Sequence, residues 1–119
     1  MKQTKRASSS KPKMEKSYAY KMNLRQRKIL YKKAVRKWGL ITQLGMLMEE
    51  AAELIKATHK VIRSWNKDYS KWNDLAEEIA DVEIMIEQIK SVTDWNNLEN
   101  KVEAFKEKKL LRLKDLVKE

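Results

Sequence analysis

Glycine and proline are nearly absent from this chain of 119 residues, which holds two glycines and one proline. A protein built from many short strands needs such residues in its turns, whereas residues that favour helices dominate here. The sequence therefore predicts an all-α fold, and its length predicts a single domain. Because the chain has no cysteine, any metal must be held by oxygen atoms or by the one histidine.

The positive charge of the chain is concentrated near its N-terminus. Residues 1–37 hold 14 of the 27 lysines and arginines but one of the 17 acids, so that residues 38–119 keep 13 basic and 16 acidic residues, a net charge of −3. Residues 1–22 are polar and basic, lack apolar periodicity and contain Pro12. We therefore expect a basic, disordered arm over residues 1–22 and a folded domain over residues 23–119.

Apolar residues recur at spacings of three and four along this domain, which predicts a bundle of about four helices. Asn23 is the expected N-cap of the first helix, with Gln26 completing a capping box and Gly39 stopping the helix after Trp38. The third helix is expected to have its N-cap at Ser70 or Asn73. The expected ranges are 23–38, about 42–64, 70 or 73 to about 92, and about 98–117.

The second and third expected helices each carry a broad apolar stripe, which in an amphipathic helix packs against other helices. The stripe residues are Leu44, Leu47, Ala51, Leu54, Ile55, Thr58, Val61 and Ile62 in the second helix, and Leu75, Ile79, Val82, Ile86 and Ile89 in the third.

These two helices also carry matching acidic segments, EEAAE over residues 49–53 and EEIAD over residues 77–81. At about 100° per residue, the second and last acids of each segment project from one edge of their helix. A short connection favours antiparallel packing of the two helices, so four carboxylates should converge across one groove. They are Glu50, Glu53, Glu78 and Asp81.

Oxygen ligands without a thiolate select hard cations, and among these we expect Mg²⁺, with Mn²⁺ as a substitute. Either acidic segment alone would more often be a pair of solvent-facing acids on an amphipathic helix. The matched pair, bordered by apolar residues, favours a metal site.

Cationic and aromatic residues are candidates for substrate binding. In the fourth helix, Lys106 and Lys109 fall within the apolar arc and Arg112 lies at its border. Snorkelling explains one such lysine, but two of them beside an arginine favour a polyphosphate held between metal and cations. Trp38 and Gln43, just before the first acidic segment, are candidates for base and sugar contacts.

The segments GMLMEEAAELIKA and LAEEIADVEIMIEQIK resemble the EExxE and ExxD motifs of MazG-like members of the all-α nucleoside triphosphate pyrophosphohydrolases, over about residues 38–116. The segment FKEKKLLRLKDL is similar to the last helix of small MazG-like proteins of phages and bacteria. The resemblance implies metal ligands at Glu50, Glu53, Glu78 and Asp81, an additional acid at Glu49, and phosphate-binding residues at Lys106, Lys109 and Arg112.

The same resemblance implies a helical bundle whose core is completed by a second subunit, in a homodimer or a homotetramer. It also implies hydrolysis of NTPs or dNTPs to the monophosphate and pyrophosphate, by metal-assisted attack of water at the α-phosphorus. Glu49 or Glu53 is expected to take the proton from that water. The basic arm is not part of the resemblance.

Two other functions stay open. Basic residues crowd the first helix beside the basic arm, which indicates nucleic-acid binding, although a solvated helix face is as good an explanation. A catalytically inactive helical adaptor would keep the bundle, but the full set of four carboxylates argues against it. Since no apolar run is long enough for a membrane span or a signal segment, we expect a cytoplasmic protein of a bacterium or a phage-infected host, without membrane contact.

Overall fold

The computed structural model describes residues 21–118, so the expected basic arm, apart from Lys21 and Met22, lies outside the described residues. The described part contains only helices and no strand, which confirms the all-α prediction. None of these helices combines the length and the apolar character that crossing a membrane requires. In chain order they are α2 (Leu24–Trp38), α3 (Leu40–Arg63), α4 (Ser70–Val92), the 3₁₀ helix η2 (Asp94–Asn96) and α5 (Leu98–Leu116).

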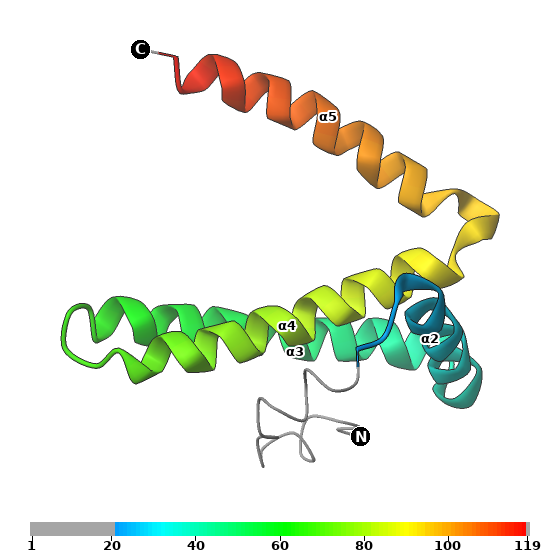
Figure 1. The fold of residues 1–119 in the computed structure, drawn as a ribbon, viewed down its shortest axis with the longest axis horizontal. Coiled ribbons are helices and arrows are strands. Elements are labelled where there is room, and N and C mark those ends of the chain that lie inside the picture. The colour runs from blue at the N-terminus through cyan, green and yellow to red at the C-terminus, as the bar shows by residue number, and fades with distance from the viewer. Residues whose placement is uncertain (1–20, 119) are drawn as a thin grey trace.

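An antiparallel hairpin of α3 and α4 is the centre of the fold (Figure 1). Residues 64–69 connect the two helices. Met46, Ala57 and Val61 of α3 and Met85 and Ile89 of α4 are buried and form most of the apolar core.

The predicted capping box begins α2. The Asn23 side chain accepts a hydrogen bond from the Gln26 N–H at 2.8 Å, and the Gln26 side chain accepts one from the Asn23 N–H at 2.9 Å. Two backbone donors that no intrahelical carbonyl can reach are thereby satisfied. The prediction of this helix start is confirmed.

One residue, Gly39, separates α2 from α3 and turns the chain sharply. Its φ of 90° and ψ of 148° lie in a region that side chains with a Cβ rarely enter, which explains the glycine. The Gly39 N–H closes α2 by donating to the Val35 carbonyl at 2.7 Å, and α3 begins at the next residue. This turn sends α2 across the hairpin, near the start of α3 and the end of α4 (Figure 1).

Two predicted helix starts differ from the structure by one or two residues, and the alternative N-cap at Asn73 is wrong. The second predicted helix begins at Leu40 rather than Thr42, because it restarts directly after the turn. The N-cap of α4 is Tyr69, and the Asp68 side chain accepts hydrogen bonds from the Ser70 N–H at 3.0 Å and from the Ser70 hydroxyl at 2.6 Å. These bonds hold the pKa of Asp68 below its usual range.

Much of the predicted apolar stripes lies on an open face of the hairpin. Ile55 and Ile62 of α3 are exposed, and so are Ile79 and Ile86 of α4. On a helical wheel this part of the α3 stripe lies roughly 130° from the edge that packs against α4. The buried edge of α3 instead carries Gln43, Met46, Glu50, Ala57 and Val61.

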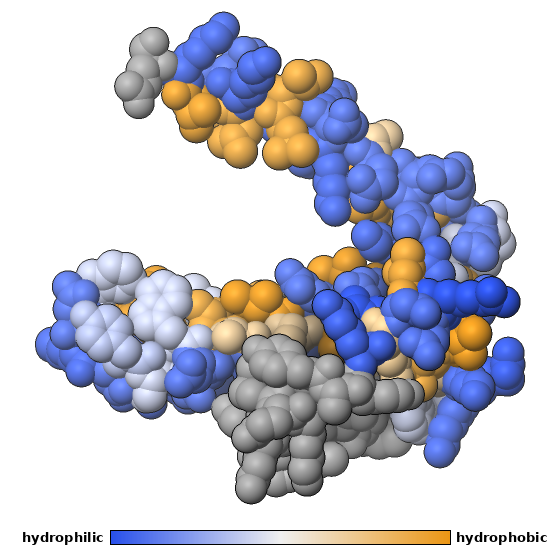
Figure 2. Space-filling view, viewed as in Figure 1, coloured by the Kyte–Doolittle hydropathy of each residue, from blue (hydrophilic) through white to orange (hydrophobic). Residues whose placement is uncertain are grey.

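The last helix, α5, leaves the hairpin at the end of α4 and extends away from it (Figure 1). None of its residues is buried, and Phe105, Leu110 and Leu113 are more than half exposed. Apolar side chains line both α5 and the hairpin where these face each other across an open angle (Figure 2). Within residues 21–118, the two apolar walls do not meet.

The turn at Gly39 gives a test of this arrangement. Replacing Gly39 by Ala should lower the free energy of unfolding by about 1–3 kcal/mol, because the Cβ strains the backbone. Gly45 is the matched control: it lies inside α3 with no atom within 4 Å of an added Cβ, so Gly45→Ala should raise stability by roughly 0.5–1 kcal/mol. Urea denaturation followed by circular dichroism measures both, and effects of the same sign would contradict the strained turn.

Candidate metal centre

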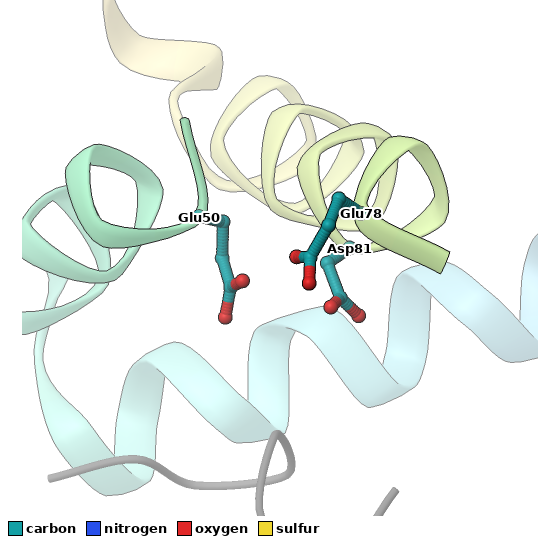
Figure 3. A group of neighbouring side chains, drawn as sticks. All are labelled: Glu50, Glu78 and Asp81. Atoms are coloured by element: carbon teal, nitrogen blue, oxygen red, sulfur yellow. The ribbon is translucent and has the colours of Figure 1, made fainter. Parts of the chain in front are cut away.

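Three of the four predicted carboxylates meet between α3 and α4. Glu50 comes from α3, Glu78 and Asp81 come from α4, and one oxygen of each lies within 4.8 Å of the others. The three side chains point into one space, on the side of the hairpin that α2 crosses (Figure 3). Glu50 is 4% exposed, and the other two are half-buried. We call these three residues the carboxylate cluster.

Glu53 lies in an adjoining groove rather than in the cluster. This groove has a volume of about 150 Å³ and is lined by Glu53, Lys56, Ala57, Lys60, Asp74, Glu77 and Glu78. Because Glu78 belongs to both the cluster and the groove, the two form one continuous polar surface. Of the four acids that were predicted to converge, three therefore lie together in the cluster, and the fourth, Glu53, lies beside them.

Sequence reasoning missed Lys56 and Lys60 as members of this surface. They follow Glu53 by three and seven residues, which places them on the same side of α3. That spacing is the signal that could have identified them. Their ammonium groups bring positive charge to the edge of an otherwise acidic site.

A buried hydrogen bond joins α3 and α4 about two helical turns from the cluster. The Gln43 side chain of α3 donates to the side-chain oxygen of Gln88 on α4, and both residues are buried. Gln43 precedes Glu50 by seven residues and Gln88 follows Asp81 by seven, so each amide shares a helix edge with a carboxylate. Gln88 was not predicted, and this seven-residue spacing is the pattern that marks it.

Contacts from α2 hold that helix against α4. The Tyr31 hydroxyl donates a hydrogen bond to Glu87, and the Arg27 guanidinium lies 3.5 Å from the same carboxylate. Burial, followed by the hydrogen bond to Glu87, raises the pKa of Tyr31 to about 12. The phenol therefore keeps its proton, and keeps donating to Glu87, to a higher pH than a free tyrosine would.

The remaining candidates on α2 and α3 lie outside the carboxylate cluster. Gln43 is fully buried in the interface between α3 and α4, where its side chain donates to Gln88. Trp38 is half-buried at the end of α2, with the Lys37 ammonium 5.4 Å from its ring centre. Glu49 is half-buried, about 100° around α3 from Glu50, and belongs to neither the cluster nor the groove.

The three cationic candidates on α5 are not near the cluster in a single chain. Lys106, Lys109 and Arg112 are all exposed, and the Lys106 ammonium lies 3.5 Å from the Glu103 carboxylate. We expected the apolar arc of α5 to pack against a core. Within the described chain it does not, since no residue of α5 is buried.

The donor set of the cluster suits a hard divalent cation. Mg²⁺ and Ca²⁺ bind oxygen at about 2.0–2.6 Å, so oxygens sharing one ion lie at most about 4–5 Å apart. One oxygen from each of the three carboxylates lies within 4.8 Å of the others, which is compatible with this limit. Carboxylates this close repel one another, and a cation between them offsets that repulsion.

Comparison with known proteins identifies no relative: no family model matches the chain, and no curated protein or solved structure gives a significant match.

Removing a ligand from the cluster should weaken binding of a divalent cation. We expect Glu50→Gln, Glu78→Gln and Asp81→Asn each to lower Mn²⁺ affinity by about tenfold or more, since even changes to residues that support a ligand cost that much. Isothermal titration calorimetry with MnCl₂ and with MgCl₂ measures the affinity. Glu107→Gln, an exposed acid on α5, is the control and should bind like the unchanged protein. Equal affinity in all four variants would refute the assignment of these ligands.

Proposed function

We propose that this chain is a Mg²⁺-dependent nucleoside triphosphate pyrophosphohydrolase, which converts an NTP or a dNTP and water into the monophosphate and pyrophosphate. The observation that carries the proposal is the convergence of Glu50, Glu78 and Asp81 from two acidic segments of adjacent helices. The resemblance of these segments to the EExxE and ExxD motifs of MazG-like enzymes supports it.

In this reaction the oxygen of water forms a bond to the α-phosphorus, and the bond from that phosphorus to the bridging oxygen of pyrophosphate breaks. The cluster would hold the cation, which supplies charge neutralisation for the triphosphate and makes water easier to deprotonate. Glu53 borders the cluster in the adjoining groove, so it is better placed than Glu49 to take the proton.

The triphosphate needs more positive charge than one cation supplies. Lys56 and Lys60 line the groove that Glu53 and Glu78 share, which makes them the candidates from the same chain for the β- and γ-phosphates. A role for the three cations of α5 requires a different arrangement, in which α5 of another subunit approaches the hairpin.

A second copy of the chain is our candidate for covering the open apolar face. Leu44, Met48, Ile55 and Ile62 of α3 expose between 38% and 74% of their surface, and α5 exposes a row of leucines. Contiguous apolar surface of this extent is rare on monomers and typical of interfaces between subunits. A homodimer or a homotetramer that pairs these faces would bury them and bring α5 of one subunit to the hairpin of another.

Pyrophosphate release from a panel of NTPs and dNTPs with MgCl₂ tests the activity. Asp81→Asn and Glu53→Gln should each lower kcat by about 100-fold or more, because each removes a carboxylate from metal binding or proton transfer. Lys56→Met should raise KM for the triphosphate. Lys67→Met, in the exposed connection between α3 and α4, is the matched control and should leave both constants unchanged.

Two results would count against the proposal. One is the absence of pyrophosphate with every nucleotide at saturating Mg²⁺. The other is full turnover in both carboxylate variants.

Subunit assembly makes a separate prediction. One chain has a mass of 14.2 kDa, and the unchanged protein should sediment with at least twice this mass. Ile55→Asp should shift the protein toward the mass of a single chain. A buried aspartate would have to lose its hydration at the interface, which costs several kcal/mol. Ile29→Asp on α2, also exposed but on another helix, is the control. Analytical ultracentrifugation reads out both, and a single species at the chain mass for the unchanged protein would contradict the assembly.

A further inference from the structure

Of the four α-helices in the described chain, α2 carries the highest net positive charge. This helix contains no acidic residue, and six cationic residues surround its solvent side. They are Arg25, Lys28, Lys32, Lys33, Arg36 and Lys37, of which Lys28 is half-buried and the other five are exposed. We call these six residues the α2 basic face. Residues 38–119, by contrast, carry a net charge of −3.

Packing of α2 against the hairpin does not use these residues. Tyr31 faces inward and is buried, and Arg27, on the same side of the helix, pairs with Glu87 of α4. Within residues 21–118, no salt bridge to any of the six basic residues is seen. Their positive charge is therefore available to a partner outside the described fold.

The spacing of the basic face costs the isolated helix some stability. Lys28, Lys32 and Arg36 follow one another at intervals of four, as do Lys33 and Lys37, and like charges at this spacing repel by a few tenths of a kcal/mol per pair. An extended polyanion would relieve this repulsion. A face that served only solubility would gain from interspersed acids, which α2 lacks.

The dimensions of the face suit a nucleic-acid backbone. Eleven residues separate Arg25 from Arg36, which is roughly 16 Å along a helix. Duplex DNA carries one negative charge per about 1.7 Å of its axis, so this length faces several phosphates. A shallow, open hollow on this face is lined by Leu24, Arg25, Lys28, Ile29 and Lys32. Ile29, half-exposed at the centre, offers an apolar contact for sugars.

We propose that the α2 basic face binds the phosphate backbone of nucleic acid. The sequence adds to this charge, because residues 1–20 contribute six further lysines and arginines against one acid directly before α2. Charge of this kind supplies affinity without reading the base sequence. The proposal is independent of the pyrophosphohydrolase, since the face shares no residue with the carboxylate cluster or its groove.

Fluorescence anisotropy with the full chain tests the proposal. The labelled probes are a duplex DNA, a duplex RNA and a single-stranded DNA of equal length, each titrated over a series of salt concentrations. The unchanged protein should bind at least one probe, with an affinity that falls steeply as salt rises. Comparing the three probes shows whether the face binds duplex DNA, duplex RNA or single-stranded DNA, all of which carry phosphate groups.

Two variants that lose the same charge at different places show whether binding depends on the α2 basic face or on the total charge of the protein. One variant combines Lys28→Gln, Lys32→Gln and Arg36→Gln, and the control combines Lys101→Gln, Lys108→Gln and Lys114→Gln on exposed positions of α5. The α2 variant should bind at least about tenfold more weakly, and its salt slope should be shallower by about 3. The control loses the same charge and should stay within about twofold of the unchanged protein.

The single substitution Lys32→Gln repeats the test with less disturbance of the helix, and should make the slope shallower by about 1. Circular dichroism checks that each variant keeps its helices. The proposal is overturned if no probe binds at low salt, or if the control weakens binding as much as the α2 variant. Binding to phosphatidylserine vesicles without binding to any nucleic acid would overturn it too.

Discussion

The packing of α3 against α4 along edges that carry both apolar and polar side chains is the interaction on which the rest of the structure depends. This edge buries Gln43 and Glu50 together with Met46, Ala57 and Val61, and the hydrogen bond from Gln43 to Gln88 fixes the register of the two helices. A buried polar pair of this kind tolerates little displacement, because the Gln88 oxygen would lose the hydrogen bond that it accepts from Gln43. With the register fixed, the acidic segments lie opposite each other.

This packing gives the hairpin two chemically different sides. The carboxylate cluster opens on the side that α2 crosses, and the apolar stripes open on the side that faces α5 (Figures 2 and 3). The sharp turn at Gly39 directs α2 to the acidic side, and the hydrogen bond from Tyr31 to Glu87 holds it there. One choice of packing edge therefore determines both where a cation could bind and which face is left for another subunit.

Local signals in the sequence predicted where the helices lie. They did not predict which edge of each helix packs against another helix. The capping residues Asn23 and Gln26 and the glycine at 39 act within one or two turns of helix, so the bounds of α2 could be read directly. The spacing of the acidic segments likewise predicted the cluster. The stripes predicted an apolar face but not its partner, because periodicity is the same whether a helix packs on its own chain or on another. For this reason α5 was expected to face a core. Glu53 was expected in the cluster because it shares an edge of α3 with Glu50, but it lines the adjoining groove with Asp74 and Glu78 instead.

The proposed metal centre and its chemistry require Glu50, Glu78 and Asp81 to share one divalent cation. The most direct measurement is an anomalous difference map from crystals of the full chain grown with MnCl₂. We expect one strong peak between α3 and α4, bonded to an oxygen of each of the three carboxylates. A map with no peak there, or with Mn²⁺ bound elsewhere while these side chains point apart, would contradict the account.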